Sequence, residues 1–378
     1  MRILFDHQAF TERRFGGVSR YFAEIISRLR QDEGFDVRLS FELSNNEPLA
    51  AMPGLPVKRF LGGAKFKGQY SLLKLLNSRR SRRALSAGGY DLFHPTYYDP
   101  YFLKYLPSKP FVLTVFDLIA EKYRGRYFEG MDITPSKKAV IGRADHVIAI
   151  SRSTRNDLLA HYSLPEEKVT VIPLACPLSE AAVYQLPGET FGAWPKPYLL
   201  FIGLRRIYKN FDLFLEAVAS LLRGKDLFLI CAGGGGFMSQ ENSLIARLGL
   251  ADRVFQTGFD DRRLALLYKN ALAFVFPSLY EGFGLPILEA FACGCPVVLS
   301  NASSFPEVAG KAGAYFDPED KDSIGRAVDK VVSDEALRKD LVRKGYSQLT
   351  LFSWEKTTEG TKSVYRQVLA DFGRARGG

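Results

Sequence analysis

The stretch "SLYEGFGLPILEAFACGCPVV", residues 278 to 298, places a glutamate on each side of a Gly-Phe-Gly-Leu-Pro turn. The apolar run at 273–278 predicts a buried strand ahead of the turn, and residues 286–293 have the pattern of a short helix. Pro286 suits the first helical position, where no N–H is required. The free N–H groups and the dipole at such a helix start favour an anion, above all a phosphate.

The two glutamates of this stretch, Glu281 and Glu289, lie before the helix and about one turn into it. Helical side chains lean toward the N-terminus, so Glu289 should point back toward Glu281. Gly282 and Gly284 allow the backbone between them to turn tightly and approach a ligand. Carboxylates that touched a phosphate would repel it. We therefore interpret them as acceptors for hydroxyl groups, a sugar at one end and a ribose at the other, which together describe a nucleotide sugar.

Short apolar strands alternate with helical patterns along the whole chain. Strands are predicted at 2–5, 36–43, 92–95, 111–117, 146–151 and 168–173 in the first half, and at 197–203, 227–233, 253–258, 273–278 and 296–301 in the second. Helices are predicted at 18–30, 134–144, 151–162, 210–223, 239–248, 260–270 and 286–293. Two such series predict an α/β protein with two doubly wound, Rossmann-like domains that face each other across a cleft.

The domain border is expected in the segment 185–197, which is rich in proline and glycine. We assign residues 1–187 to an N-terminal acceptor domain and 188–355 to a C-terminal donor domain. The C-terminal helix, 356–378, is expected to pack back onto the N-terminal domain. Ser151 should cap the helix at 151–162.

The composition indicates a chain with a sizeable core. It has 378 residues, 47% of them hydrophobic, and no run of eighteen apolar residues that would predict a membrane span. The N-terminus lacks the pattern of a signal peptide. The four cysteines, Cys176, Cys231, Cys293 and Cys295, lie in or beside apolar runs, which is typical of buried thiols in a reducing compartment. We therefore expect a cytoplasmic protein.

Positive charge is concentrated in the first half of the chain. Residues 1–180 hold 27 Lys and Arg against 19 Asp and Glu, a net of +8, and the remainder holds 24 against 22, a net of +2. The stretch from Ser71 to Leu85 interleaves leucines with Lys74 and four arginines. Such a segment can lie on the anionic inner face of a membrane or bind nucleic acid, and a solvated surface helix is the alternative.

The segment from Glu281 to Glu289, followed by 293–310, resembles the signature of the retaining GT-B glycosyltransferases of family four (glycosyl transferases group 1). The resemblance runs over nearly the whole chain. It implies that Glu281 contacts the donor hexose and Glu289 the ribose. It also implies that the backbone of Phe283, Gly284 and Leu285 holds hexose and phosphate.

The loop at 201–217 resembles the family's Arg…Lys-Asn motif, in which two cations stabilise the leaving diphosphate. Lys209 and Asn210 match clearly, and Gly203 precedes them. The arginine is Arg205 or Arg206, and we favour Arg205. A guanidinium binds a diphosphate in bidentate fashion and an ammonium binds it as a point charge. Charged surface residues without a ligand are the alternative.

Three further segments complete the expected site. Gly16 and Gly17 enter the first long helix and would let backbone amides approach the donor phosphate, as the resemblance implies. Gly233 and Gly234 belong to a glycine run that does not match G-x-G-x-x-G, and we expect a turn beside the nucleotide base or phosphate.

The last of them combines the stretches 93–100 and 114–123, which carry His94 and Asp117, and both residues are expected at strand ends facing the cleft. Family members commonly have a histidine just before this aspartate, where this chain has Phe116. A histidine that only satisfies hydrogen bonds at a strand end is the alternative for His94.

Together these features predict a retaining hexosyltransferase that uses neither a metal nor another cofactor. It would move mannose or glucose from a nucleoside diphosphate sugar, such as GDP-mannose, to a saccharide or lipid-linked saccharide in polysaccharide assembly. An anionic membrane surface is a candidate partner and nucleic acid is not. The alternatives are another GT-B-type enzyme, such as an epimerase or a phosphorylase, an NAD-dependent oxidoreductase, and a non-catalytic sugar-nucleotide binding module.

Overall fold

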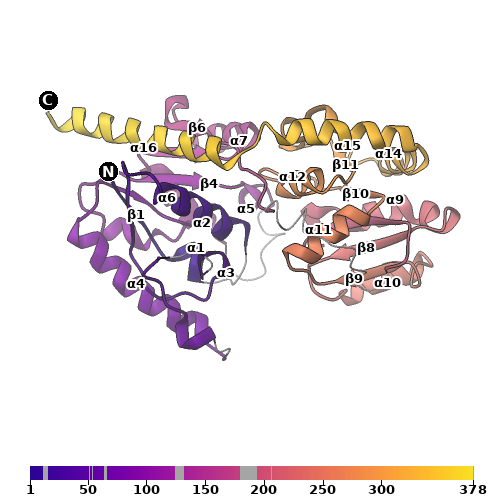
Figure 1. The fold of residues 1–378 in the computed structure, drawn as a ribbon, viewed down its shortest axis with the longest axis horizontal. Coiled ribbons are helices and arrows are strands. Elements are labelled where there is room, and N and C mark those ends of the chain that lie inside the picture. Colours follow the sequence, from indigo (N-terminus) through magenta and orange to yellow (C-terminus); the bar gives the residue numbers. More distant parts are fainter. Residues whose placement is uncertain are drawn as a thin grey trace. The chain divides into compact units, whose positions relative to one another are not determined.

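The computed structural model describes residues 1–11, 16–50, 52, 54–63, 66–123, 132–178, 194–205 and 207–377. The chain forms two compact units, coloured along the sequence in Figure 1. The first unit comprises Met1–Glu121, Gly130–Leu174 and Trp354–Gly378, and the second comprises Lys122–Glu129 and Ala175–Ser353. The predicted border between 187 and 188 lies outside the described residues. No helix in the described ranges is both long and apolar enough to cross a membrane.

The first unit is built on parallel strands. One sheet has the order β2-β1-β3 and a second the order β4-β5-β6, and a parallel bridge between Phe93 and Phe111 connects them. The strands are β1 (Arg2–Phe5), β2 (Asp36–Leu39), β3 (Leu92–His94), β4 (Val112–Val115), β5 (His146–Ala149) and β6 (Val169–Val171). Every residue of β3, β4 and β5 is buried, as expected for strands covered on both faces.

Eight α-helices are described in the first unit: α1 (Gln8–Thr11), α2 (Gly17–Leu29), α3 (Glu47–Ala50), α4 (Gln69–Ala87), α5 (Ile119–Lys122, whose last residue falls in the second unit), α6 (Thr134–Arg143), α7 (Arg152–Tyr162) and α16 (Trp354–Gly377). The predicted cap of α7 is confirmed, since Ser151 Oγ accepts from the N–H of Thr154 at 2.9 Å. Helix α16 packs on α2 and β5, and its Tyr365 is fully buried.

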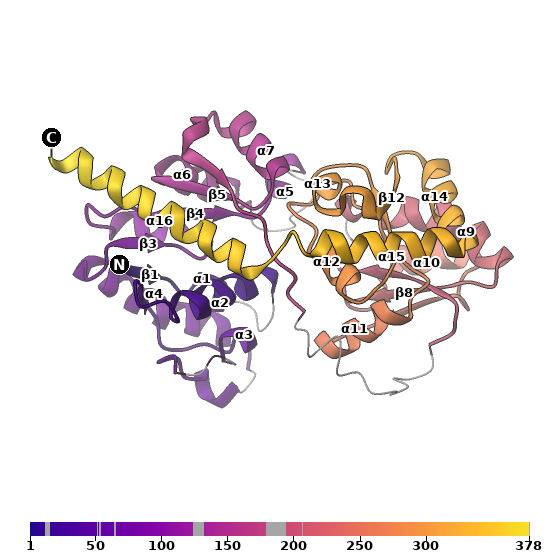
Figure 2. The ribbon, with the colours of Figure 1, turned by 45° about the horizontal axis from the view of Figure 1, so that its top comes forward.

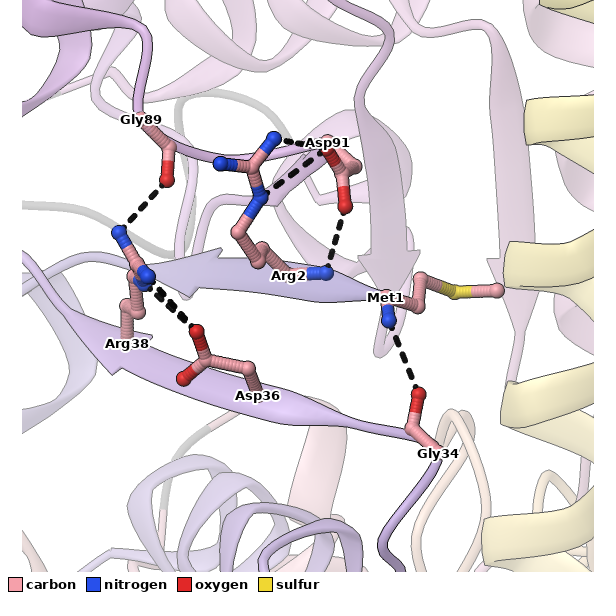
Figure 3. Close-up of polar contacts among 7 residues, drawn as sticks. All are labelled: Met1, Arg2, Gly34, Asp36, Arg38, Gly89 and Asp91. Carbon is pink, nitrogen blue, oxygen red and sulfur yellow. Dashed lines mark hydrogen bonds and ion pairs between the residues drawn. The ribbon is translucent and has the colours of Figure 1, made fainter.

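Charged side chains hold the edge at which the strands of the first unit begin (Figure 3). Arg2 Nη2 donates to Asp91 Oδ1 at 2.7 Å, and the backbone N–H of Arg2 donates to Asp91 Oδ2 at 2.8 Å. Arg38 Nη2 donates to Asp36 at 2.8 Å, and its Nη1 to the carbonyl of Gly89 at 2.8 Å. The hydrogen bond from Arg2 lowers the pKa of Asp91. These pairs stabilise the edge that lies away from the carboxyl ends of the strands.

The second unit holds one parallel six-stranded sheet in the order β12-β11-β10-β7-β8-β9. Its strands are β7 (Tyr198–Ile202), β8 (Phe228–Ala232), β9 (Val254–Thr257), β10 (Ala273–Phe276), β11 (Val297–Ser300) and β12 (Gly313–Phe316). Counted from β7, this is the order of the doubly wound dinucleotide-binding fold, and the winding reverses between β7 and β10. Ligands of such sheets bind beyond the carboxyl ends of those two strands.

Helices cover both faces of this sheet (Figure 2). They are α9 (Phe211–Gly224), α10 (Ser239–Arg247), α11 (Asp261–Asn270), α12 (Leu285–Ala292), α13 (Phe305–Ala309), α14 (Lys321–Ser333) and α15 (Glu335–Leu349). Side chains of α9, α10 and α14 share one buried cluster with Val275 of β10. The neighbouring residue Phe274 points to the other face, where Tyr268 of α11 packs on it edge-on. Strand β12 and helices α14 and α15 were not predicted from the sequence.

Candidate active site

Two loops at the switch point of the second unit bring Lys209 and Glu281 together. Lys209 ends the 3-10 turn Ile207–Lys209 that follows β7, and Glu281 lies in the loop after β10. Lys209 Nζ lies 2.5 Å from Glu281 Oε1, which also accepts from Ser278 Oγ at 2.8 Å. The two charged side chains are 11% and 14% exposed. They form a partly accessible ion pair where the fold binds ligands.

The start of α12 stands directly beside this pair. Gly284 is its N-cap residue with φ +102°, and Pro286 lies in its first turn, as predicted. A side chain at Gly284 would also be crowded, since a Cβ there would lie 3.0 Å from Ile287 Cδ1 and 3.1 Å from the Phe305 ring. Only glycine combines this left-handed conformation with this close approach at low cost. The close packing around Gly284 therefore fixes the backbone at the start of α12.

Two serines that sequence analysis did not single out hold the loop between Glu281 and Gly284. Ser303 Oγ donates to the carbonyl of Glu281 at 2.5 Å, and Ser304 Oγ donates to the carbonyl of Phe283 at 2.8 Å. Both follow β11, the neighbour of β10 in the sheet. The signal that could have found them is a pair of hydroxyl residues directly beyond a strand end, in "NASSF" at 301–305.

Glu289 is buried on the first turns of α12. Its Oε2 accepts from the hydroxyl of Tyr268 on α11 at 3.0 Å. Burial, together with the nearby Glu289 carboxylate, raises the pKa of Tyr268 well above its usual value, so the phenol stays a neutral donor. Tyr268 thus holds the Glu289 carboxylate in position between helices α11 and α12.

Arg205 lies within a network of contacts inside the second unit. Its guanidinium is enclosed, with 2% of the side chain exposed, and pairs with Glu241 of α10 at 2.9 Å. Three more of its N–H groups donate to the carbonyls of Gly233, Gly235 and Gly236 at 3.1, 3.0 and 2.9 Å. These contacts occupy four of the five N–H groups of the guanidinium, and contact of Arg205 with a diphosphate stays a prediction. The alternative, Arg206, lies outside the described residues.

The glycine run after β8 forms a tight turn beside Gly203. Gly233, Gly234 and Gly235 have φ of +82°, +76° and +73°. A Cβ on Gly234 would lie 2.7 Å from the carbonyl oxygen of Gly203 and 2.8 Å from Arg205 Nη1. The absence of side chains therefore lets the β8 loop approach the β7 loop. The structure thus brings Gly203, Gly233 and Gly234 together at one edge of the sheet.

The remaining predicted residues belong to the first unit. Gly16 and Gly17 lie at the start of α2, as the sequence indicated. Asp117 follows β4 and is partly buried. Its Oδ1 accepts from the N–H of Ile119 at 3.0 Å, and its carbonyl accepts from the buried Lys137 at 2.5 Å. Asp117 therefore keeps a defined position beyond the strand end.

His94 lies in the interior of the first unit. The side chain is completely buried, with Nδ1 2.6 Å from the Tyr365 hydroxyl and Nε2 3.0 Å from Thr114 Oγ1. Burial lowers the pKa of His94 to about 3, so the ring is neutral. Both nitrogens are used inside the first unit, and the ring packs against Phe22. The structure therefore favours the alternative, a hydrogen-bonded strand-end histidine, over a catalytic one.

Comparison with known proteins identifies the family. A model of the glycosyl transferases group 1 matches residues 192–348, and one of glycosyltransferase family 4 matches residues 15–180. The O-antigen chain mannosyltransferase B of Escherichia coli is 31% identical over 305 residues, covering 78% of this chain and 78% of that protein. The chain belongs to the group 1 glycosyltransferases.

Solved structures agree with the fold of this glycosyltransferase. Sucrose-phosphate synthase from Thermosynechococcus elongatus superposes with a TM-score of 0.72 at 21% identity, covering 98% of this chain and 99% of that one. The Anabaena protein HepE, in complex with UDP and glucose, also gives 0.72, at 18% identity, covering 97% and 99%. The predicted fold, two Rossmann-like domains of the GT-B type, is confirmed.

Proposed function

We propose that this glycosyltransferase moves a hexose from a nucleoside diphosphate sugar to a hydroxyl group of a saccharide or lipid-linked saccharide, with retention of configuration at the anomeric carbon. The observation that carries the proposal is the pair Lys209–Glu281 beside the start of α12, at the switch point between β7 and β10. A cation and a helix N-terminus fit the diphosphate, and a carboxylate within the same few ångströms fits the hydroxyls of the attached sugar.

The proposed reaction breaks the bond between the anomeric carbon and the diphosphate oxygen. Lys209 and the N–H groups at the start of α12 stabilise the negative charge that develops on the leaving diphosphate. Glu281 holds hydroxyls of the hexose, and Glu289, fixed by Tyr268, accepts from the ribose. The acceptor hydroxyl attacks from the face that the diphosphate leaves, and its proton passes to the departing phosphate oxygen. The protein contributes by positioning the reactants and stabilising charge. In the first unit, the candidates for these roles are Asp117 and the backbone amides of Gly16 and Gly17.

The sugar proposed for the donor is mannose, with glucose second and GDP as the preferred nucleotide. The printed name of the Escherichia coli relative, a mannosyltransferase, supports this choice. A thermal-shift screen with GDP-mannose, UDP-glucose and ADP-glucose tests it, because a ligand that binds the folded state raises the melting temperature. Stabilisation by UDP-glucose alone would exclude GDP-mannose. Retention is tested by NMR of the product, whose new anomeric carbon must keep the configuration of the donor.

A lipid-linked acceptor would be met at a membrane, and we propose that α4 holds the enzyme on the anionic inner face. The helix buries Leu73, Asn77, Ser81 and Leu85 against the first unit. It leaves Leu72 and Leu75 42% and 48% exposed, and its 19 residues carry five basic side chains and no acidic one. Each basic residue near such a surface contributes about 1 kcal/mol to binding.

Vesicle co-sedimentation tests this surface. Wild type should bind vesicles that contain anionic lipid, and this binding should weaken as the salt concentration rises. Changing Arg79, Arg80, Arg82 and Arg83 to Ser should abolish binding. The matched control changes four exposed basic residues of α14 and α15 to Ser and keeps α4 intact: Arg326, Lys330, Lys339 and Arg343. Wild type that ignores anionic vesicles at low salt would exclude the membrane proposal and leave glycosyl transfer untouched.

A further inference from the structure

Arg205 donates hydrogen bonds to other groups of the protein. Nε donates to Glu241 Oε1, Nη1 donates to Gly233 O, and Nη2 donates to both Gly235 O and Gly236 O. The guanidinium also lies over the ring of Phe237, 4.8 Å from its centre. A guanidinium has five N–H groups, so four of the five already have partners.

The carbonyls that accept hydrogen bonds from Arg205 belong to the glycine turn after β8. In a trans peptide the N–H of one residue points away from the carbonyl of the residue before it. Since the carbonyls of Gly233, Gly235 and Gly236 point at Arg205, the N–H groups of Gly234, Gly236 and Phe237 point away from it. Arg205 therefore sets the direction of three backbone donors at the carboxyl edge of the sheet.

Glu241 completes this arrangement from α10. Its Oε1 faces Arg205, and its Oε2 accepts from the N–H of Met238 at 2.7 Å. The carboxylate is 4% exposed, so the Arg205 charge is matched inside the protein. Four successive glycines have more freedom to lose than any other sequence, and a turn made of them keeps one shape only if its surroundings hold it.

We propose that Arg205 and Glu241 are positioning residues, which hold the turn Gly233–Gly236 so that its N–H groups meet the donor nucleotide, while Arg205 itself does not contact the diphosphate. The inference rests on the proposed function in one respect, that the ligand is a nucleoside diphosphate sugar.

The direction in which one substitution changes nucleotide affinity distinguishes this role from direct contact. Glu241→Gln keeps the size of the side chain and removes the charge opposite Arg205. If Arg205 positions the turn, the dissociation constant for GDP or UDP should rise about tenfold, the scale of one charge-assisted hydrogen bond. If Arg205 binds the diphosphate, removal of the competing carboxylate should leave that constant unchanged or lower it. The control is Glu216→Gln, which removes an equal charge from an exposed pair with Arg247 and should change nothing.

Arg205→Lys gives the second readout. Lysine keeps the charge and has a single ammonium, so it cannot reach Glu241 and three carbonyls together. Positioning predicts that Arg205→Lys binds nucleotide as weakly as Arg205→Gln, with a raised KM for the donor and a kcat within about threefold of wild type. Rescue of affinity by lysine would overturn the proposal.

Calorimetric titration with GDP, UDP and ADP, well below the melting temperature of each variant, measures these constants. Wild type that binds none of the three would overturn the proposed function and this inference together. Wild type that binds one of them, with a Glu241→Gln variant that binds it equally well or better, would overturn the inference alone.

Discussion

Removing the charge of Lys209 should separate what the ion pair does for stability from what it does for catalysis. In Lys209→Met the aliphatic chain can keep its place beside the rings of Phe276 and Tyr208, whose centres lie 4.9 and 5.4 Å from Nζ. The ammonium is lost, and Glu281 retains the hydroxyl of Ser278 as a partner. The substitution therefore leaves a largely buried carboxylate without its cation.

The expected loss of stability follows from the burial of the pair. Breaking a fully buried ion pair costs about 3–5 kcal/mol. Exposures of 11% and 14% let water reach both groups, so we expect about 2–3 kcal/mol here. For a unit of this size that lowers the melting temperature by roughly 5–10 °C. Turnover should fall by about two to three orders of magnitude, as for the loss of one oxyanion donor.

The double variant Lys209→Met with Glu281→Gln supplies the decisive comparison. It removes both charges, so most of the lost stability should return while turnover stays low. Calorimetric melting and a donor-saturated transfer assay measure the two quantities. Near-normal turnover in Lys209→Met would refute the assigned role of the cation. A double variant no more stable than Lys209→Met would refute the claim that the two charges depend on each other.

Three other outcomes are expected. Glu289→Ala should weaken binding of the bare nucleoside diphosphate, whereas Glu281→Ala should leave that binding nearly intact and lower turnover of the sugar donor; equal losses of affinity, measured by titration calorimetry, would contradict the split. His94 has a pKa of about 3 when folded, against about 6.5 when unfolded, so its contribution to stability is complete above pH 6.5 and is lost toward pH 3, by up to about 1.4 kcal/mol per pH unit. Urea unfolding at pH 4.5 to 7 should therefore give a shallower pH dependence for His94→Gln, and parallel curves would count against this account. Gly284→Ala should destabilise by at least about 1–2 kcal/mol, because it forces a side chain into a left-handed, crowded position, and should weaken donor binding; Gly142→Ala, with open space around it, is the control and should cost nothing in either assay.

The places in the fold that could be predicted from the sequence are those defined by neighbours in the chain. The start of α12 follows from Gly284 and Pro286 within three residues of each other. Lys209 and Glu281 were assigned to strand ends, and the strand order then brings them together, because β7 and β10 are adjacent. Local pattern and the rules of parallel sheets were sufficient for these residues.

Two of the candidate site residues have partners far away in the sequence. Arg205 pairs with Glu241, 36 residues on, and His94 with Tyr365, 271 residues on. A basic loop before a helix looks the same whether its arginine faces a ligand or a neighbouring turn. A polar side chain that will be buried can be recognised only when its hydrogen-bond partner is known, and that partner is identified by the folded structure. The same limit hid Tyr268, whose contact with Glu289 depends on the packing of α11 against α12.

The return of the chain to the first unit has a consequence for biosynthesis. Helix α16 begins at Trp354, after the second unit. The hydroxyl of its Tyr365 lies 2.6 Å from His94 Nδ1, and Nζ of its Lys362 lies 2.7 Å from Asp32 Oδ2. A ribosome makes strands β1 to β6 before α16, and those strands must wait for that helix before their core is complete. The second unit, which is continuous from Ala175 to Ser353 apart from one short segment, can fold earlier. Nascent chains stalled before residue 354 should therefore carry an unfinished first unit that is open to chaperones and proteases, although its strands were synthesised first.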